Sequence, residues 1–356
     1  MSEASDHAEL CYRMCCREGY GVAREGKWVL GVARGARRAA ESILRAARGA
    51  DGERCGGGGG ESTPAIELRS INLLVNDHYL LGTLMPRLSI SSWSLHTLLG
   101  KAWYDPDGSG GYTNRSDEAE EIELLEVPAE SVKHRIGTIE LCHFHFPRVD
   151  QEYLQRLKAA ISAAGVELFS VLIDTGDITA EDVSKREADF ETIRGWINVA
   201  ARLGAGHVRI IAGDAEASSE SVGLSVTGLR SLADYASAKG VVALTENFKR
   251  LAARPETCLE ILEKCGDEVG LCADFGNFPA DSRSEDLAAV LPKANSIHAK
   301  ADYVDGVMDC ETYKHHVKQA VESGFDGPMS LIYQDADDVW SRIEELRDAT
   351  LEVIDS

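Results

Sequence analysis

The sequence predicts an α/β fold, a closed (β/α)8 TIM barrel over residues 85–356 that follows a poorly ordered N-terminal extension. Eight short apolar runs recur between residues 86 and 335, and helical patterns separate most of them. Strands that alternate with helices indicate a parallel sheet, and eight such units favour a closed barrel over an open sheet. Several of the later runs end in polar residues of metal-ligand type, at the strand ends where such barrels place their active sites.

The apolar runs have the length of buried strands, and turn residues bound them. No Gly-x-Gly-x-x-Gly motif follows any of them, so a dinucleotide site has no support. The polar, acidic stretch 105–130 interrupts the rhythm after the first run and is expected to be an active-site loop. In chain order the strand candidates are residues 88–94, 136–146, 166–174, 207–213, 241–248, 269–275, 295–301 and 329–334.

Between the strands, apolar residues recur with the helical period. Residues 151–164 carry one apolar stripe, with Asp150 as the expected N-cap and Gly165 as the expected end. Similar patterns predict helices over 180–203, with Thr179 and Asp182 in capping-box positions, and over 337–354, which closes the fold.

Residues 1–84 lack a pattern that could pack a core. They combine an Arg/Ala-rich stretch with an unbroken glycine run, Gly56 to Gly60, which is typical of a flexible linker. Their 11 acidic residues argue against an organellar transit peptide, and a natural start at Met85 is the other interpretation. Four cysteines lie in this segment without a CxxC pair, so a zinc site is not expected there.

The net charge of −22 belongs entirely to the barrel region. Residues 1–84 are balanced, whereas residues 85–356 carry 26 basic and 48 acidic residues. Such a surface repels a phosphate backbone, so nucleic acid is excluded as a partner. No apolar run approaches the roughly 20 residues of a membrane span, and no signal-peptide pattern is present. We therefore expect a cytoplasmic protein whose partner is a small molecule, with homo-oligomerisation left open.

Polar residues at the ends of four late strands are the candidate metal ligands. Glu246, Asp274, His298 and Gln334 end the fifth to eighth apolar runs. A charged group facing a barrel interior is costly unless it is paired or metal-bound, so the alternative is that these groups bond one another. Carboxylate and imidazole together suit one divalent cation, with Mn²⁺ or Mg²⁺ preferred and Zn²⁺ or Co²⁺ as alternatives.

Five further residues are candidates for substrate contact or proton transfer. His145 follows His143 on one face of the second strand and is the candidate acid or base. Lys300 ends the seventh strand, where it contacts substrate or pairs with an acid. Arg209 either clamps a substrate or forms a salt bridge. Trp93 and His96 follow the first strand, where an indole can stack on a sugar or simply pack.

Six motifs in order, ISSWSLH, IELCHFHF, LGAGHVRIIAG, LTENF, ADFGNF and SIHAK, resemble the sugar phosphate isomerase/epimerase family of xylose isomerase-like TIM barrels. The resemblance implies a divalent metal held by Glu, Asp, His and a second Glu on the eighth strand. The first three correspond to Glu246, Asp274 and His298. In two places the chain departs from the family: Ile332 stands where the second Glu is expected, with Gln334 two residues further on, and Phe248 stands where a His often follows Glu-Asn.

The leading hypothesis is a metal-dependent isomerase or epimerase of a small sugar or polyol that reacts through an enediolate. Glu246 takes the α-proton, and His145 or Lys300 replaces the missing carboxylate. A polyol dehydratase needs only one base and one acid. The absence of a carboxylate at residue 332 therefore argues less strongly against a dehydratase than against an epimerase. A barrel that binds a sugar or partner without catalysis is the third hypothesis, and the acidic surface argues against the family's endonuclease branch.

Overall fold

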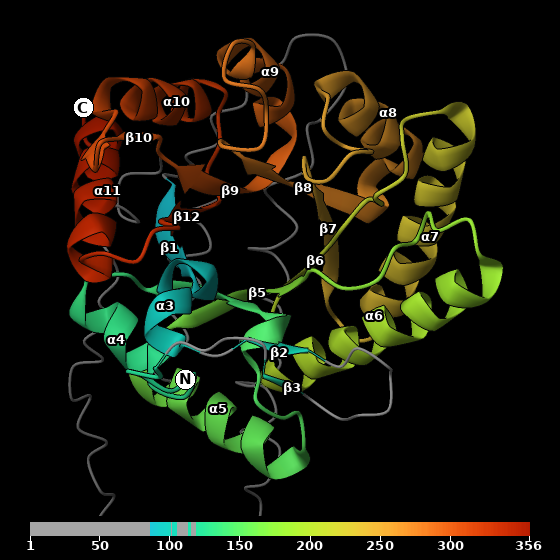
Figure 1. Ribbon diagram of the computed structural model, residues 1–356, viewed down its shortest axis with the longest axis horizontal. Helices are drawn as coiled ribbons and strands as arrows, with labels where there is room; N and C mark the ends of the chain where they lie inside the picture. Colours follow the sequence, from blue (N-terminus) through green and yellow to red (C-terminus); the bar gives the residue numbers. More distant parts are fainter. Residues whose placement is uncertain (1–85, 101, 105–112, 115–118) are drawn as a thin grey trace, which may run out of the picture. The chain divides into compact units, whose positions relative to one another are not determined.

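Eight parallel strands close into a barrel, with helices arranged around its outside (Figure 1). The structure is a computed structural model that describes residues 86–100, 102–104, 113–114 and 119–356, so the predicted N-terminal extension lies outside the described residues. Neighbouring strands follow the order β1-β12-β9-β8-β7-β6-β5-β4 around the barrel, which confirms the predicted fold. The barrel strands are β1 (Arg87–Ser91), β4 (Thr138–Cys142), β5 (Glu167–Ile173), β6 (His207–Ile210), β7 (Val242–Glu246), β8 (Val269–Asp274), β9 (Ala294–Lys300) and β12 (Pro328–Ile332).

Several strands end earlier than their apolar runs predict. The run 136–146 ends as a strand at Cys142, because His143–His145 turns into a 3-10 helix. The prediction that His143 and His145 lie on one face of the second strand is therefore wrong. The eighth strand likewise ends at Ile332 rather than at residue 334.

Nine α-helices are present in the described part of the chain, and two of them test the capping predictions. Helix α5 spans the predicted residues 151–164, Asp150 accepts a hydrogen bond from the Tyr153 amide, and Gly165 ends the helix at φ +70°. Helix α6 begins at Val183, later than predicted, because Asp182 alone is its N-cap. The helices are α3 (His96–Leu99), α4 (Val127–Lys133), α5 (Gln151–Ala164), α6 (Val183–Leu203), α7 (Ser219–Ser237), α8 (Pro255–Cys265), α9 (Arg283–Val290), α10 (Cys310–Glu322) and α11 (Val339–Ile354).

Smaller elements complete the described chain. Part of the predicted loop 105–130 lies outside the described residues, and its last residues, 127–130, already belong to α4, so the loop ends earlier than predicted. None of the helices in the described ranges is long and apolar enough to cross a membrane. Two short antiparallel pairs are β2 (Trp103–Tyr104) with β3 (Thr113–Asn114) and β10 (Tyr303–Val304) with β11 (Val307–Met308), and 3-10 turns are η2 (Ser92–Leu95), η3 (His143–His145), η4 (Gly266–Glu268) and η5 (Leu291–Lys293).

The apolar core surrounds the barrel, whereas polar side chains are buried within its strands. Leu157 of α5 and Leu232 of α7 are fully buried in the apolar cluster; burial of such a side chain stabilises the fold by about 1.5–3 kcal/mol. Ser89, Ser170 and Ser330 are also fully buried on barrel strands. Because serines occupy little volume, they leave space among the strands for long charged side chains.

Candidate active site

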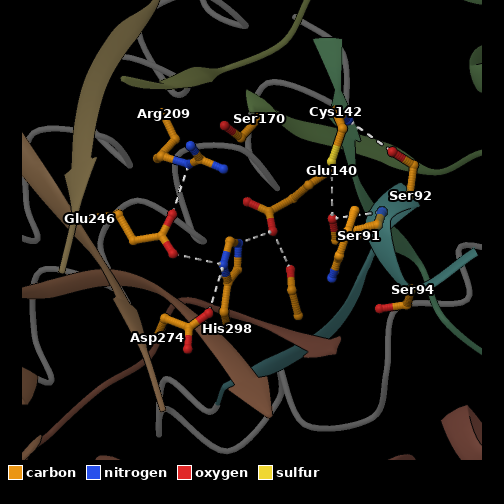
Figure 2. A network of polar contacts seen from close by, with 12 residues as sticks. Ser91, Ser92, Ser94, Glu140, Cys142, Ser170, Arg209, Glu246, Asp274 and His298 are labelled. Atoms are coloured by element: carbon orange, nitrogen blue, oxygen red, sulfur yellow. Dashed lines mark hydrogen bonds and ion pairs between the residues drawn. The ribbon is translucent and has the colours of Figure 1, made fainter. Parts of the chain in front are cut away.

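Three of the predicted metal ligands lie together at the carboxyl ends of neighbouring strands (Figure 2). Glu246 ends β7, Asp274 ends β8 and His298 lies on β9 beside Asp274 in the strand register. His298 Nδ1 is 3.5 Å from Glu246 Oε1 and 3.5 Å from Asp274 Oδ2. All three residues are buried, so the structure brings together the groups that the strand ends predicted.

A third acidic residue, Glu140, lies on the other side of His298. His298 Nε2 is 3.1 Å from Glu140 Oε2, which also accepts a hydrogen bond of 2.5 Å from Ser330 Oγ. Glu140 is 1% exposed, and its Oε1 has no hydrogen-bond partner among the described residues. Burial by itself raises the pKa of Glu140, but the charge and hydrogen bond of His298 and the Ser330 hydrogen bond together lower it below its usual value.

Arg209 joins Glu246 to another carboxylate. Its Nε is 2.8 Å from Glu246 Oε2 and its Nη1 is 2.5 Å from Asp174 Oδ1. Burial raises the pKa of Asp174, yet the Arg209 charge and hydrogen bond bring it below the usual value. Of the two interpretations open for Arg209, the salt bridge is therefore present, and it holds Glu246 from one side while Asn277 Nδ2 donates to Glu246 Oε1 at 3.0 Å from another.

Residues that follow β7 and β8 fix Asp274. The Asn247 side chain accepts from the Asp274 amide at 2.7 Å and donates to the Asp274 carbonyl at 3.0 Å, while Gly276 N donates to Asp274 Oδ1 at 2.6 Å. A Cβ on Gly276 would lie only 2.6 Å from Lys300 Cδ. Glycine at this position therefore lets the side chain of the predicted catalytic Lys300 pack against the backbone of the residue two positions after Asp274.

The charges around His298 fit a divalent cation. Four carboxylates, those of Glu140, Asp174, Glu246 and Asp274, meet the Arg209 guanidinium and the His298 imidazole. Burial lowers the pKa of His298, but the Cys272 sulfur and the carboxylates of Glu246 and Glu140 raise it well above its usual value. Even with a protonated imidazole, acidic groups outnumber these two cationic groups by two. A buried site with this charge excess and these oxygen and nitrogen donors suits a metal ion.

The eighth strand contributes no carboxylate to this group. Ile332 is buried, with Lys300 as its register partner on β9. Gln334 follows the end of β12 and is exposed. The alternation that placed Gln334 with the other candidate ligands does not apply beyond the strand, and the structure does not bring it to the buried cluster.

The remaining predicted residues form an aromatic group near the ends of β1 and β4. The rings of Trp93 and His96 stack with centroids 4.6 Å apart, and Trp93 meets Phe144 edge-on. Trp93 is 39% exposed, so part of this residue is accessible to solvent. His145 is buried, its Nδ1 is 2.8 Å from Ser92 Oγ, and burial lowers its pKa to about 3, so its ring is neutral near pH 7.

Sequence reasoning missed Glu140, Asp174 and Cys272 as neighbours of this site. Cys272 lies directly beside the predicted ligands: it, Glu246 and His298 each present a donor atom within 4.8 Å of the others. Glu140 could have been identified from the sequence, because an acidic residue at the centre of an apolar strand must be paired when it is buried. Asp174 follows directly after β5, the same position relative to its strand that drew attention to the other candidates.

Comparisons with known proteins point to one fold family. A family model described as a xylose isomerase-like TIM barrel matches residues 129–355, and a search of curated protein sequences gave no significant match. Among solved structures, a xylose isomerase-like TIM barrel protein from Mycobacterium smegmatis in complex with magnesium has 18% identity and a TM-score of 0.56, covering 76% of this chain and 96% of that chain.

Two further solved structures have similar likeness. An L-ribulose 3-epimerase has 17% identity and a TM-score of 0.57, covering 76% of this chain and 95% of its own. A probable 3-DHS dehydratase involved in petrobactin synthesis, from Bacillus anthracis, has 14% identity and a TM-score of 0.55, covering 74% and 97%. At these identities the likeness establishes the fold alone.

Proposed function

The chain belongs to the xylose isomerase-like TIM-barrel family, and from this premise we propose that it is a divalent-metal-dependent isomerase or epimerase of a small sugar or polyol. The observation that carries the proposal is the buried group of Glu246, Asp274 and His298, in which the imidazole Nδ1 lies 3.5 Å from both carboxylates. The L-ribulose 3-epimerase with the same fold supports a sugar substrate.

Glu246, Asp274 and His298 would hold the metal. Two carboxylates and one imidazole favour Mg²⁺ or Mn²⁺, and the Mycobacterium smegmatis protein of this fold is a magnesium complex. When bound, the cation would polarise a substrate carbonyl and its neighbouring hydroxyl and lower the cost of negative charge developing on them.

Glu246 is the proposed base that removes the proton from the carbon next to the carbonyl. Arg209 and Asn277 contact its two oxygens and fix the orientation of the carboxylate. A base that is held in one orientation transfers a proton at a lower entropic cost. The enediolate that results regains a proton at the neighbouring carbon for isomerisation, or on the opposite face of the same carbon for epimerisation.

Lys300 is the better placed of the two candidate proton donors. It ends β9, its side chain lies against Gly276, and its register partner is Ile332, the position at which the family expects a second carboxylate. His145 is bonded to Ser92 and has a depressed pKa, so its neutral ring is better suited to a hydrogen bond than to proton donation near neutral pH. The half-exposed Trp93, stacked on His96, would contact the C–H face of the sugar.

A dehydratase is the second candidate function, favoured by one observation. Ile332 removes the second carboxylate of a two-base epimerase, whereas elimination of water needs one base and one acid. Glu246 would again remove the α-proton, and Lys300 would protonate the departing hydroxyl. The probable 3-DHS dehydratase shares this fold. Mass spectrometry separates the two functions, since a dehydratase product has lost one water and an isomerase product has the mass of its substrate.

The test is a screen of ketoses and polyols in D2O with added Mg²⁺ or Mn²⁺, read by proton NMR. The wild-type protein should exchange the α-proton of its substrate for deuterium, and Glu246→Gln should not. Glu268→Gln, which removes an exposed carboxylate of similar size, is the matched control and should exchange like the wild type. Full turnover by Glu246→Gln would disprove the base role, and binding without exchange or turnover would favour the non-catalytic barrel.

A further inference from the structure

We propose that Glu140 is a positioning residue that fixes the imidazole of His298 with Nδ1 directed toward Glu246 and Asp274. The inference rests on the proposed function, because it concerns how the ligand face of His298 is selected. The residue that it adds to the site lies on β4, the second strand of the barrel in chain order. Glu140 is not one of the three residues proposed to donate to the metal. Figure 2 shows Glu140 and the pair Glu246 and Asp274 on different sides of the imidazole.

The two nitrogens of His298 have different partners. Nε2 lies 3.1 Å from Glu140 Oε2, a hydrogen-bond distance, whereas Nδ1 lies 3.5 Å from an oxygen of Glu246 and from an oxygen of Asp274. A carboxylate accepts and does not donate, so Glu140 keeps a proton on Nε2. When the imidazole is neutral, the lone pair is then on Nδ1 and faces the two carboxylates, as a metal ligand requires.

Glu140 is itself held in place. Ser330 Oγ donates to the same Oε2 at 2.5 Å, and Ser330 is the register partner of His298 on β12. Glu140 is 1% exposed and Ser330 is fully buried, so neither side chain has solvent as an alternative partner. Through this chain of two hydrogen bonds the eighth strand supports the site, although Ile332 supplies no ligand.

The geometry argues against Glu140 as a direct ligand of the same cation. The two ring nitrogens of an imidazole point away from each other, and Glu140 occupies the Nε2 side while Glu246 and Asp274 occupy the Nδ1 side. A carboxylate that receives the second N–H of a metal-binding histidine orients the ring and raises its basicity, and loss of such a partner typically weakens metal binding about 10- to 100-fold.

The test compares metal binding in the full-length wild type with Glu140→Ala, Glu140→Gln and Ser330→Ala. Dissociation constants for Mn²⁺ and Zn²⁺ are measured by competition with a chromophoric chelator. The tautomer of His298 is read from its 15N shifts in the Zn²⁺-loaded protein, a signal that a merely structural role would not change. Glu167→Gln removes a partly exposed carboxylate of a neighbouring strand and is the matched control.

We expect Glu140→Ala to bind metal about 10- to 100-fold more weakly and to lose the single Nε2–H tautomer. Glu140→Gln should retain that tautomer, because its amide oxygen accepts from Nε2–H, and should recover part of the affinity. Ser330→Ala should weaken binding less, and Glu167→Gln should match the wild type. If Glu140→Ala does not fold, the glutamine and Ser330 variants decide the question.

Two results would overturn the inference in distinguishable ways. Wild-type affinity and tautomer in Glu140→Ala, wild-type affinity in Glu140→Gln and Ser330→Ala if Glu140→Ala does not fold, or an Nδ1–H tautomer in the loaded wild type, would refute the positioning role and leave the proposed function standing. A wild-type protein that binds neither metal would refute the metal site and this inference together.

Discussion

Replacing Arg209 with methionine should destabilise the metal-free protein by about 3–5 kcal/mol, the usual cost of removing one partner from a buried ion pair. Arg209 is 4% exposed and lies 2.5 Å from Asp174 and 2.8 Å from Glu246. Methionine fills much of the same volume, so the loss comes mainly from two buried carboxylates that no longer face a cation. Total stabilities are about 5–15 kcal/mol, so the variant should still fold.

The assay is urea unfolding followed by far-UV circular dichroism in the presence of a chelator. Arg230→Met is the matched control, because Arg230 forms a two-bond pair with Glu268 at 2.8 and 2.9 Å, yet both side chains are largely exposed. Solvent screens such a pair, so this variant should unfold at the wild-type midpoint. Both arginines lie within hydrogen-bond distance of carboxylate oxygens but differ in burial, so comparing the two variants shows the effect of the environment.

A divalent cation provides a second arm of the same experiment. A cation held by Glu246 would supply the positive charge that Arg209 no longer provides, so added Mn²⁺ should narrow the difference between Arg209→Met and the wild type. A loss for Arg209→Met below about 1 kcal/mol, the size typical of exposed pairs, would refute the reasoning that Arg209 compensates buried charge.

Two further predictions concern pH and the eighth strand. The pKa of His145 is about 3 in the folded protein and near 6.5 when unfolded. The unfolded state therefore binds more protons between these values, so the stability of the fold decreases as the pH is lowered from 6.5 toward 3. His145→Phe should remove about 3 kcal/mol of the wild-type loss between pH 6.5 and 4, measured by urea unfolding across that range; identical pH slopes would contradict it. Ile332→Glu restores the carboxylate that the family expects and should tighten Mn²⁺ binding about tenfold or more. The same change should lower the stability of the metal-free protein, because Ile332 is buried and a buried carboxylate without a partner is costly. Chelator competition and thermal unfolding check both effects, and unchanged affinity would place residue 332 outside the ligand sphere.

Much of the fold could be predicted because each element has a local cause. The helix over 151–164 has its cap, its stripe and its terminal glycine within one stretch of sequence, and the structure reproduces its bounds. Strand ends were less predictable. Apolar residues continue past Cys142, but the backbone turns there into a 3-10 helix, and hydrophobicity does not distinguish the two.

The site was predictable where it depends on strand ends and not where it depends on pairing across the barrel. Glu246 and Asp274 end consecutive strands, and His298 lies beside Asp274 near the end of the next strand, so parallel geometry alone brings them together. Glu140 meets His298 from a position 158 residues earlier in the chain, and only closure of the barrel makes them neighbours. Gln334 was selected by extending the strand period, which stops at Ile332.

Metal content measured by elemental mass spectrometry on the full-length protein, beside Glu246→Ala and Asp274→Ala, tests the central claim most directly. We expect about one divalent metal per chain in the wild type and a loss of that metal in both variants, because each removes a carboxylate next to His298 Nδ1. No metal in the wild type, together with no thermal shift on adding Mn²⁺, Mg²⁺, Zn²⁺ or Co²⁺, would contradict the proposed metal-dependent chemistry.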